Sequence, residues 1–315
     1  MKSLNILICC NNLAATGGAT EVYAINHELL KRGHEVEVYS PVAGLISKKM
    51  INYINKDNIK QRYDLLLIFH KDILEFIIEK GVEGKKIFTM TGIGSQDVPM
   101  GFAGPKTYKE NTSFIDILNN DVDSLVSRTD EIRQKRDGVL ISQGIDCSRF
   151  RPTSNIKKDN PRVLSMVRSE KANDIIRKSC ELLNLEFVGW SEPASYEGYV
   201  DNKRTTFEVE KEVNKADIVV GLGRIVLESL ACGRQPIVFD DRFYQGNLGD
   251  GIVIPSNIDD LAIYNFSGRY SNKYFSVDDM VEELKKYDSN HSEFFRNYIL
   301  KKFNVIDKVD EYLSL

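Results

Sequence analysis

The chain has 315 residues, a length that suits two domains of ordinary size or one large domain. Hydrophobic residues make up 42% of it, enough for buried cores, and because the net charge is −4 we exclude nucleic acid as a main partner. The five cysteines include no CxxC pair and no zinc-site spacing with histidine, so we expect no bound metal and no disulfide framework.

The first apolar run, Asn5–Cys10, is too short for the hydrophobic segment of a signal peptide and is better explained as a β-strand. No stretch approaches the roughly 20 apolar residues that span a bilayer. These patterns predict a cytoplasmic protein.

In the first half, short apolar runs alternate with amphipathic segments. The expected strands are Asn5–Cys10, His34–Ser40, Asp64–Phe69, Lys86–Met90, Val122–Val126 and Val139–Ser142. The expected helices between them are Ala19–Arg32, Lys71–Lys80 and Thr129–Arg136. The first helix has its apolar residues on one face, namely Val22, Ile25, Leu29 and Leu30, and Gly33 ends it.

A linker, Cys147–Pro161, is polar and without periodicity, and a second series of strands and helices follows it. The expected strands are Val163–Val167, Leu185–Val188, Asp217–Gly221 and Pro236–Phe239. The expected helices are Lys171–Leu183, Thr206–Lys215, Val226–Cys232, Val277–Lys286 and Ser292–Leu313. Continuous apolar strands between helices predict parallel sheets that are covered on both faces.

We therefore predict an α/β protein with one domain at 1–150, a second at 151–290, and a C-terminal helix at 291–315 that packs back towards the first domain. Ligands of open parallel sheets bind at the carboxyl ends of the strands. Two such domains facing each other predict a ligand site in the cleft between them.

The loop between the first strand and its helix, Asn11–Gly18, ends in the paired glycines Gly17 and Gly18. Glycines allow close approach of a ligand to the backbone, and the following helix N-terminus favours an anion. The pattern is not GxGxxG, so a dinucleotide site is poorly supported. The alternative is a tight turn without a ligand.

Two cations, Arg168 and Lys171, follow the first strand of the second half in the segment VRSEK. A pair of cations at a strand end suits a diphosphate, and the alternative is ordinary surface charge.

The segment Ala216–Phe239 predicts a strand, a glycine turn, a helix and a second strand. Gly223 and Arg224 stand at the start of the helix, where amides and a guanidinium can hold a phosphate. Glu228 lies about one turn later among apolar residues, where a carboxylate needs a partner such as a sugar hydroxyl. The alternative is an acid on the helix surface.

These segments resemble the family-four glycosyltransferases, retaining enzymes of GT-B architecture with two facing Rossmann-like domains. The segment GGATEVYAINHELLKRGHEVEVYS resembles their first βαβ unit, and ISQGIDCSRFRP resembles the hinge phrase PNGVDxxxFxP. MVRSEK is similar to GRLxxEKG, and ADIVVGLGRIVLESLACGRQPIVF to the donor-domain signature that ends in EAMACGxPVV. The C-terminal segment FFRNYILKKFNVIDKVDEYLSL is similar to the closing helices. The ordered set spans nearly the whole chain.

The resemblance implies a role for each matching position. Gly17 and Gly18 would lie beside the donor phosphates, and Arg168 and Lys171 would neutralise the diphosphate. Glu228 matches the second acid of the family's paired-Glu motif, which binds the ribose. Gly223 and Arg224 would sit near the phosphates or the sugar. No cofactor or metal is implied beyond the nucleoside-diphosphate-sugar donor itself.

The sequence departs from the family at two places. The first acid of the paired-Glu motif falls on Val220, which has no hydrogen-bonding side chain, and the family histidine falls on Thr91. His70, at the end of an expected strand, and Asp97, in the glycine-rich loop, are the candidate catalytic residues in its place. His70 could equally be a strand-end histidine with a structural hydrogen bond.

A basic cluster occupies the segment SKKMINYINKDNIKQR: Lys48, Lys49, Lys56, Lys60 and Arg62. Family members often act on lipid-linked acceptors, so one interpretation of the cluster is a peripheral contact with the inner membrane face. The alternative is the solvent-exposed face of an ordinary helix. The expected acceptor is a carbohydrate, a lipid-linked molecule or a protein, and the oligomeric state is not predicted.

The resemblance therefore implies a metal-independent glycosyltransferase of glycan or glycoconjugate biosynthesis that moves a sugar from UDP or GDP with retention of configuration. Two alternatives remain. One is a GT-B protein that binds a sugar nucleotide or glycan with little or no turnover, as the residues at 220 and 91 suggest. The other is a sugar-nucleotide epimerase, which also uses two facing Rossmann-like domains.

Overall fold

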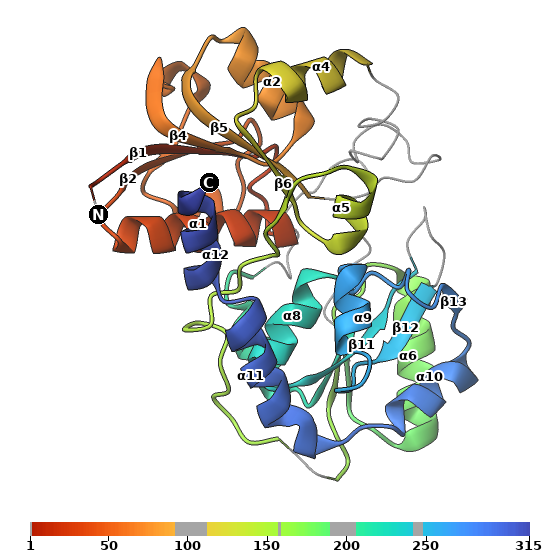
Figure 1. The fold of residues 1–315 in the computed structure, drawn as a ribbon. Helices are drawn as coiled ribbons and strands as arrows, with labels where there is room; N and C mark the ends of the chain where they lie inside the picture. The colour runs from red at the N-terminus through yellow and green to blue at the C-terminus, as the bar shows by residue number, and fades with distance from the viewer. Residues whose placement is uncertain (1, 92–111, 157–158, 190–205, 242–247) are drawn as a thin grey trace. The chain divides into compact units, whose positions relative to one another are not determined.

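The computed structural model describes residues 2–91, 112–156, 159–189, 206–241 and 248–315. The chain divides into two compact units. The first comprises Met1–Gly144 with Val305–Leu315, and the second comprises Ile145–Asn304. Each unit consists of helices packed on a central β-sheet (Figure 1).

The sheet of the first unit is parallel throughout, and its strand order is β3-β2-β1-β4-β5-β6-β7. The strands are β1 (Asn5–Cys9), β2 (Glu35–Tyr39), β3 (Tyr53–Ile54), β4 (Arg62–Ile68), β5 (Glu83–Met90), β6 (Ser124–Ser127) and β7 (Val139–Leu140). All except β3 were predicted, β2 from its alternating pattern EVEVY and the others from short apolar runs. This order, with the first strand inside the sheet, is typical of Rossmann-like domains.

The helices of the first unit are α1 (Gly17–Lys31), α2 (Lys71–Glu79), α4 (Thr112–Asn120), α5 (Asp130–Lys135) and α12 (Val305–Ser314). Helix α1 begins where the hydroxyl of Thr16 accepts a hydrogen bond from the amide of Ala19. It ends at Lys31 with Arg32 as its C-cap, and Gly33 follows in the left-handed region with a φ of 83°. Leu30 lies outside the buried face predicted for it, with 37% of its surface exposed.

The basic segment after β2 is not one helix. It forms the 3₁₀ turn Ser47–Lys49, the short strand β3 and a second 3₁₀ turn, Lys56–Asn58. Lys60 is paired with Glu37 of β2, with 2.9 Å between Nζ and Oε1. The lysines therefore do not form the basic face of a helix.

The sheet of the second unit is mixed, with the order β13-β12-β11-β10-β8-β9. Its strands are β8 (Val163–Ser165), β9 (Phe187–Gly189), β10 (Ile218–Gly221), β11 (Gln235–Phe239), β12 (Leu248–Ile252) and β13 (Lys273–Tyr274). Strands β8 to β11 pair in parallel as predicted, but β12 and β13 add antiparallel pairs at one edge. The sequence LGDGI of β12 contains two glycines and no apolar run, so its pattern did not indicate a strand.

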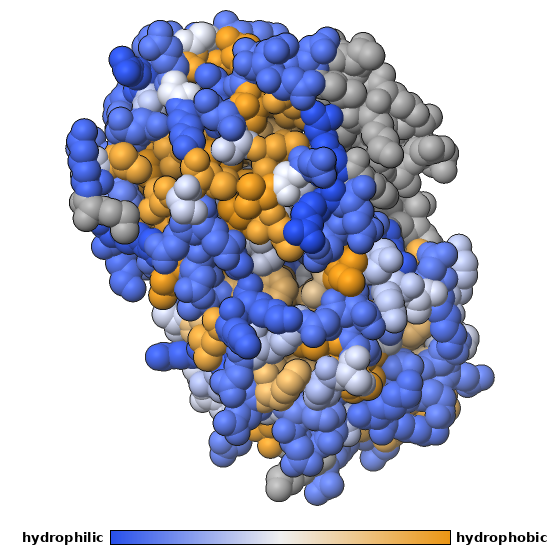
Figure 2. Space-filling view, in the orientation of Figure 1, coloured by the Kyte–Doolittle hydropathy of each residue, from blue (hydrophilic) through white to orange (hydrophobic). Residues whose placement is uncertain are grey.

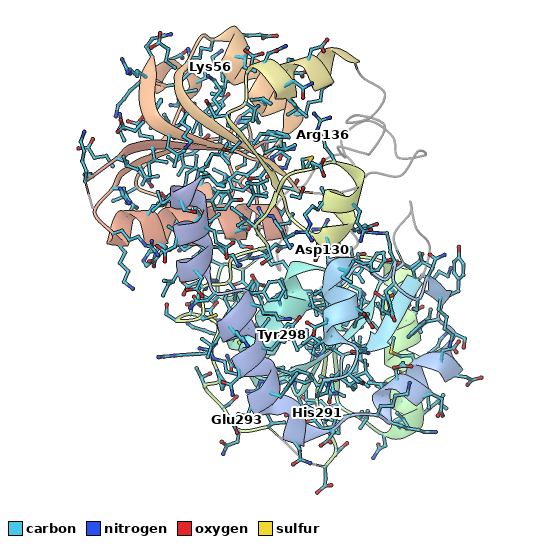
Figure 3. The ribbon with its side chains drawn as sticks, in the orientation of Figure 1. Lys56, Asp130, Arg136, His291, Glu293 and Tyr298 are labelled. Carbon is cyan, nitrogen blue, oxygen red and sulfur yellow. The ribbon has the colours of Figure 1, made fainter. Side chains whose placement is uncertain are left out.

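The helices of the second unit are α6 (Glu170–Leu183), α7 (Val209–Lys215), α8 (Arg224–Ala231), α9 (Ile258–Ile263), α10 (Val277–Leu284) and α11 (Ser292–Lys302). The single helix predicted at Ser292–Leu313 is two helices, α11 and α12. It breaks because the carbonyl of Phe303 accepts from the amide of Ile145, and Ile145 and Asn304 form a β-bridge. Tyr298 of α11, labelled in Figure 3, donates from its hydroxyl to Asp259 of α9 at 2.8 Å.

Hydrophobic side chains gather over the middle of the first unit in Figure 2, over α1, α12 and the sheet, and hydrophilic side chains surround them. Leu30 of α1 and Ile306 of α12 are among the exposed large hydrophobic residues. None of the helices in the described ranges combines the length and the apolar character that a membrane span requires.

Candidate functional site

The glycine turn before α8 lies at the carboxyl edge of the second sheet. Gly221 ends β10, and Gly223 is the N-cap of α8 with φ 69° and ψ −125°, a conformation that favours glycine. The amides of Arg224 and Ile225 are the first two of the helix and have no acceptor among the residues that the structure describes. Because a helix N-terminus attracts negative charge, this turn can hold an anion.

Arg224 and Glu228 form a buried ion pair one turn apart on α8. Nε of Arg224 lies 2.8 Å from Oε1 of Glu228, and the two side chains are 5% and 7% exposed. Burial raises the pKa of Glu228, while the guanidinium groups of Arg224 and Arg149 partly offset this rise. Nη1 of Arg224 is buried and has no hydrogen-bond partner within the described part of the chain. It can therefore still donate to a ligand.

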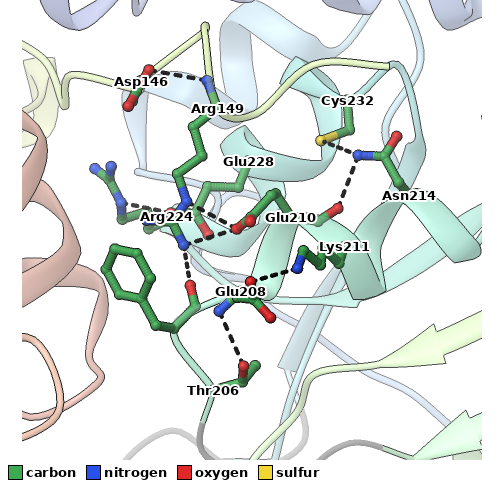
Figure 4. Close-up of polar contacts among 11 residues, drawn as sticks. Asp146, Arg149, Thr206, Glu208, Glu210, Lys211, Asn214, Arg224, Glu228 and Cys232 are labelled. Carbon is green, nitrogen blue, oxygen red and sulfur yellow. Dashed lines mark hydrogen bonds and ion pairs between the residues drawn. The ribbon is translucent and has the colours of Figure 1, made fainter. Parts of the chain in front are cut away.

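Arg149 extends this set of charges beside Glu228 (Figure 4). Its Nε donates to Oε2 of Glu210 at 2.9 Å, and its Nη2 donates to the backbone carbonyl of Phe207. The ring centroid of Phe207 lies 4.1 Å from Cζ of Arg149, a stacking geometry for a guanidinium. The carboxylate of Asp146 accepts from the amide of Arg149 at 3.1 Å. Protein groups therefore fix Arg149 more completely than Arg224.

The two predicted diphosphate ligands follow β8, the neighbour of β10 in the sheet. The side chain of Lys171 is 70% exposed, and its Nζ lies 3.3 Å from Oδ2 of Asp241. The amides of Arg168 and Ser169 each donate to the carboxylate of Asp240 at 3.4 Å. A carboxylate of the chain itself therefore already contacts the amides that precede α6.

Asp240 and Asp241 are residues of this edge that the sequence analysis missed. They directly follow β11, so the pair of acids after the apolar run QPIVF was the available indication. Topology brings Arg168, Lys171, Gly223 and Arg224 to one edge of one sheet, since β8, β10 and β11 are adjacent. Their roles toward a donor stay predictions.

Gly17 and Gly18 are the first two residues of α1. A Cβ built on Gly18 would meet no heavy atom within 4 Å, and its φ lies outside the left-handed region. Neither the backbone conformation nor packing therefore requires glycine at this position. The open space is what approach of a ligand to the backbone needs, and that role stays a prediction.

His70 is the N-cap residue of α2, at the carboxyl end of β4. Its Nδ1 accepts a hydrogen bond from the amide of Asn11 at 3.2 Å, so the neutral ring carries its proton on Nε2. Burial lowers the pKa of His70 to about 4. Such a weak base is poorly suited to remove protons near pH 7, but its Nε2–H can donate a hydrogen bond.

Three positions from the sequence analysis remain, and the structure describes two of them. Asp97 lies outside the described residues. Thr91 directly follows β5. Val220 of β10 is completely buried in an apolar cluster with Val163 and Ile237, so its side chain faces the core.

Comparison with family models finds no match, and comparison with curated proteins finds none either. Solved structures do match over the whole chain. A glycosyltransferase from Rickettsia africae is 13% identical with a TM-score of 0.61, covering 100% of this chain and 98% of its own. An alpha-glucosyltransferase in complex with UDP is 12% identical with a TM-score of 0.62 and 99% coverage of both chains. MurG of Acinetobacter baumannii is 8% identical with a TM-score of 0.51, covering 98% of this chain and 99% of its own.

These similarities show the fold. The chain has the GT-B architecture of two Rossmann-like units, as predicted. At these identities they do not test the narrower resemblance to the family-four enzymes.

The exclusion of nucleic acid as a partner was wrong. Further structures of the alpha-glucosyltransferase, with 11% and 10% identity and TM-scores of 0.58, are complexes with DNA. A net charge of −4 describes the whole chain, whereas the field that attracts DNA depends on the charges near the binding surface. Net charge therefore does not rule out nucleic acid for a protein of this fold.

Proposed function

We propose that this protein is a glycosyltransferase that binds a nucleoside-diphosphate-sugar donor on its second unit, with the diphosphate at the N-terminus of α8. One observation carries the proposal. Within the described part of the chain, Nη1 of Arg224 is buried without a partner, and the first two amides of the same helix, those of Arg224 and Ile225, have no acceptor. A buried donor without a partner costs free energy, and an anionic ligand would supply the missing acceptor.

The chemistry of transfer uses such a site directly. The bond between the anomeric carbon and the diphosphate oxygen breaks, a bond to the acceptor oxygen forms, and the proton of the acceptor hydroxyl passes to the departing diphosphate or to solvent. Negative charge grows on the departing diphosphate, so the amides of Arg224 and Ile225 and the guanidinium of Arg224 would stabilise it most in the transition state. Arg168 and Lys171 would add charge, and Lys171 would exchange Asp241 for phosphate.

Titration calorimetry with UDP and with uridine tests the donor site. UDP is the first choice because the alpha-glucosyltransferase neighbours are complexes with UDP or UDP-glucose. In Arg224→Gln we expect UDP to bind about 10- to 100-fold more weakly, the loss of a charge-assisted contact of roughly 1.5–3 kcal/mol. Uridine, which lacks the diphosphate, should change much less.

The matched control is Arg177→Gln on the exposed face of α6, where Arg177 pairs with Asp174 and Glu181 of its own helix. It should leave UDP affinity unchanged. Equal losses of UDP and uridine in Arg224→Gln would show that Arg224 does not contact phosphate.

We also propose that transfer retains the anomeric configuration and needs no divalent cation or other cofactor. The four ordered family-like segments support retention, and the cations Arg168, Lys171 and Arg224 could do the work often given to Mg²⁺. Product stereochemistry by NMR and activity in the presence of EDTA test the two statements separately. The acceptor screen includes carbohydrate, lipid-linked, protein and DNA acceptors.

The second candidate is a sugar-nucleotide-binding protein with little turnover. It is favoured by Val220, whose side chain is buried in the core where the family carries an acid. Binding of UDP without release of UDP from UDP-sugars, with or without acceptors, would support this candidate over the enzyme.

A further inference from the structure

The turn that follows α9, Tyr264–Ser267, contacts the glycine turn of the proposed donor site. The carbonyl of Phe266 accepts a hydrogen bond from the amide of Gly223 at 2.8 Å. A Cβ built on Gly223 would lie 3.8 Å from the carbonyl oxygen of Asn265 and 3.9 Å from its Nδ2. Residues distant in sequence from α8 thus touch the first residue of its N-terminal turn.

The backbone of this second turn is unusual. Asn265 and Phe266 are consecutive non-glycine residues in the left-handed region, with φ values of 56° and 49°. Asparagine tolerates this region, but a bulky residue such as phenylalanine rarely adopts it. Strained backbone of this kind persists only where its surroundings fix it.

Two sets of contacts fix it here. The ring of Phe266 is 1% exposed in the core with Val226 and Leu227 of α8, and its amide donates to the carbonyl of Leu261 at 2.9 Å. Beyond the turn, the carboxylate of Asp250 accepts from the amide of Gly268 at 2.9 Å. The loop is therefore held at both ends.

We propose that Asn265 is a positioning residue of the donor site, which acts by keeping the carbonyl of Phe266 on the amide of Gly223. This inference rests on the proposed function. When that carbonyl holds Gly223, the amides of Arg224 and Ile225 remain for the donor's diphosphate.

The proposal assigns the effect of Asn265 to its left-handed backbone conformation and not to contacts of its side chain. Asn265→Gly keeps easy access to the left-handed region and removes only the carboxamide, so UDP affinity should stay within about twofold of wild type. Asn265→Ala disfavours that region and should weaken UDP about tenfold. Rescue by glycine, the smaller side chain, is a result that lost side-chain contacts would not give.

Asn272 provides a matched control in the same loop. It also has a left-handed φ, 50°, but it is exposed, and the atoms within 4 Å of a Cβ built on Gly223 belong to Asn265 instead. Asn272→Ala should lower the melting temperature about as much as Asn265→Ala does, without changing UDP affinity. Equal losses of UDP affinity in Asn265→Ala and Asn272→Ala would mean that general destabilisation causes the loss, and this would overturn the proposal.

Amide hydrogen exchange at Gly223 tests the same contact without a nucleotide. Protection should fall in Asn265→Ala and remain in Asn265→Gly and in Asn272→Ala. Unchanged protection in Asn265→Ala, or a loss of UDP affinity in Asn265→Gly as large as in alanine, overturns the proposal. Failure of the wild type to bind any nucleoside diphosphate would instead contradict the proposed function, and exchange would still decide whether Asn265 positions Gly223.

Discussion

Each unit holds a deeply buried arginine–glutamate ion pair, and the two pairs are built differently. In the first unit Nη1 of Arg128 lies 2.5 Å from Oε1 of Glu21, and the side chains are 1% and 5% exposed. In the second unit Arg224 and Glu228 are buried to a similar degree. Residue types and burial are thus nearly the same, so any difference in role must come from the surrounding partners.

The first pair connects elements that are far apart in the sequence. Arg128 follows β6 and also donates to the carbonyl of Ser142 at 3.3 Å, while Glu21 of α1 accepts from the amide of Gly144 at 3.3 Å. The ring centroid of Phe69 lies 5.7 Å from Cζ of Arg128. This pair ties helix α1 to the carboxyl edge of the sheet.

Helix α12 closes the same network. The hydroxyls of Tyr312 and Thr89 lie 2.9 Å apart, both buried, and burial raises the pKa of Tyr312 while the guanidinium of Arg128 offsets part of the rise. The pair on α8, by contrast, joins residues of one helix. Each pair leaves one guanidinium nitrogen buried without a hydrogen-bond partner among the described residues, Nη2 of Arg128 and Nη1 of Arg224. Arg224 differs from Arg128 because it is the first residue of α8, directly after the glycine turn, so we infer that the first pair serves stability and the second is available to a ligand.

The largest expected effect is the loss of stability in Arg128→Leu. It leaves the Glu21 charge buried without its partner, which costs about 3–5 kcal/mol. Arg224→Leu should cost less, about 1–3 kcal/mol, because Arg149 also stabilises the charge of Glu228. Urea unfolding followed by circular dichroism measures both. The surface variant Arg177→Leu should change stability by less than about 0.5 kcal/mol. Equal losses in the two buried variants would contradict the comparison.

A buried neutral group extends the comparison, since His70 has a pKa lowered by burial to about 4. The unfolded chain binds this proton near pH 6.5 and the folded chain only near pH 4. Protonation of the unfolded chain therefore lowers the free energy of unfolding as the pH falls from about 6.5 to about 4. The total loss is about 3 kcal/mol, and above about pH 6.5 there is no loss.

The measurement is the difference in unfolding free energy between wild type and His70→Asn from pH 7 to pH 4. Asparagine can still accept from the amide of Asn11 but does not titrate. His34, whose pKa is also lowered by burial, is present in both proteins and cancels. A difference that stays constant across this range would mean that His70 titrates normally.

A smaller loss is expected from Tyr312→Phe. The hydroxyl of Thr89 is completely buried and loses its partner, which costs about 1–3 kcal/mol. The matched variant Tyr298→Phe removes a hydroxyl whose partner, the side chain of Asp259, is 70% exposed, so water can replace the bond and the cost should be below 1 kcal/mol. Thermal unfolding of the two variants measures both losses of stability. A larger loss in Tyr298→Phe would contradict the expectation that the buried network around Arg128 contributes more to stability.

Sequence patterns predicted most of the fold because the central strands are continuous apolar runs. They failed where the pairing partner, rather than the pattern, decides the structure. The strand β12 pairs antiparallel with β11 although LGDGI has no strand pattern. The helix predicted to run through residue 303 breaks because the carbonyl of Phe303 bonds to Ile145.

The same limit applies to the sites. Glu228 and Arg224 were singled out because they follow a glycine turn in one short segment. Their mutual pairing was not foreseen, because it depends on how deeply α8 is buried. Glu21 and Arg128 stood out in no motif, since only the folded sheet brings them together.

The smallest expected effect, and the sharpest test of the difference between the pairs, comes from Glu228→Gln. Glutamine keeps the shape and one acceptor oxygen but loses the charge that holds Nε of Arg224. If Glu228 also accepts from the ribose hydroxyls, as the family resemblance implies, UDP should weaken by about one hydrogen bond, on the order of 1 kcal/mol or fivefold. A site that bonds a hydroxyl rejects a ligand without it, so wild type should prefer UDP over 2′-deoxy-UDP, and this preference should shrink in Glu228→Gln and further in Glu228→Ala. The affinity ratio of the two nucleotides in each protein is the measurement. A ratio near one in wild type, or one that neither variant changes, would mean that Glu228 serves only Arg224. The pair on α8 would then be a structural pair like the one that joins Arg128 to Glu21.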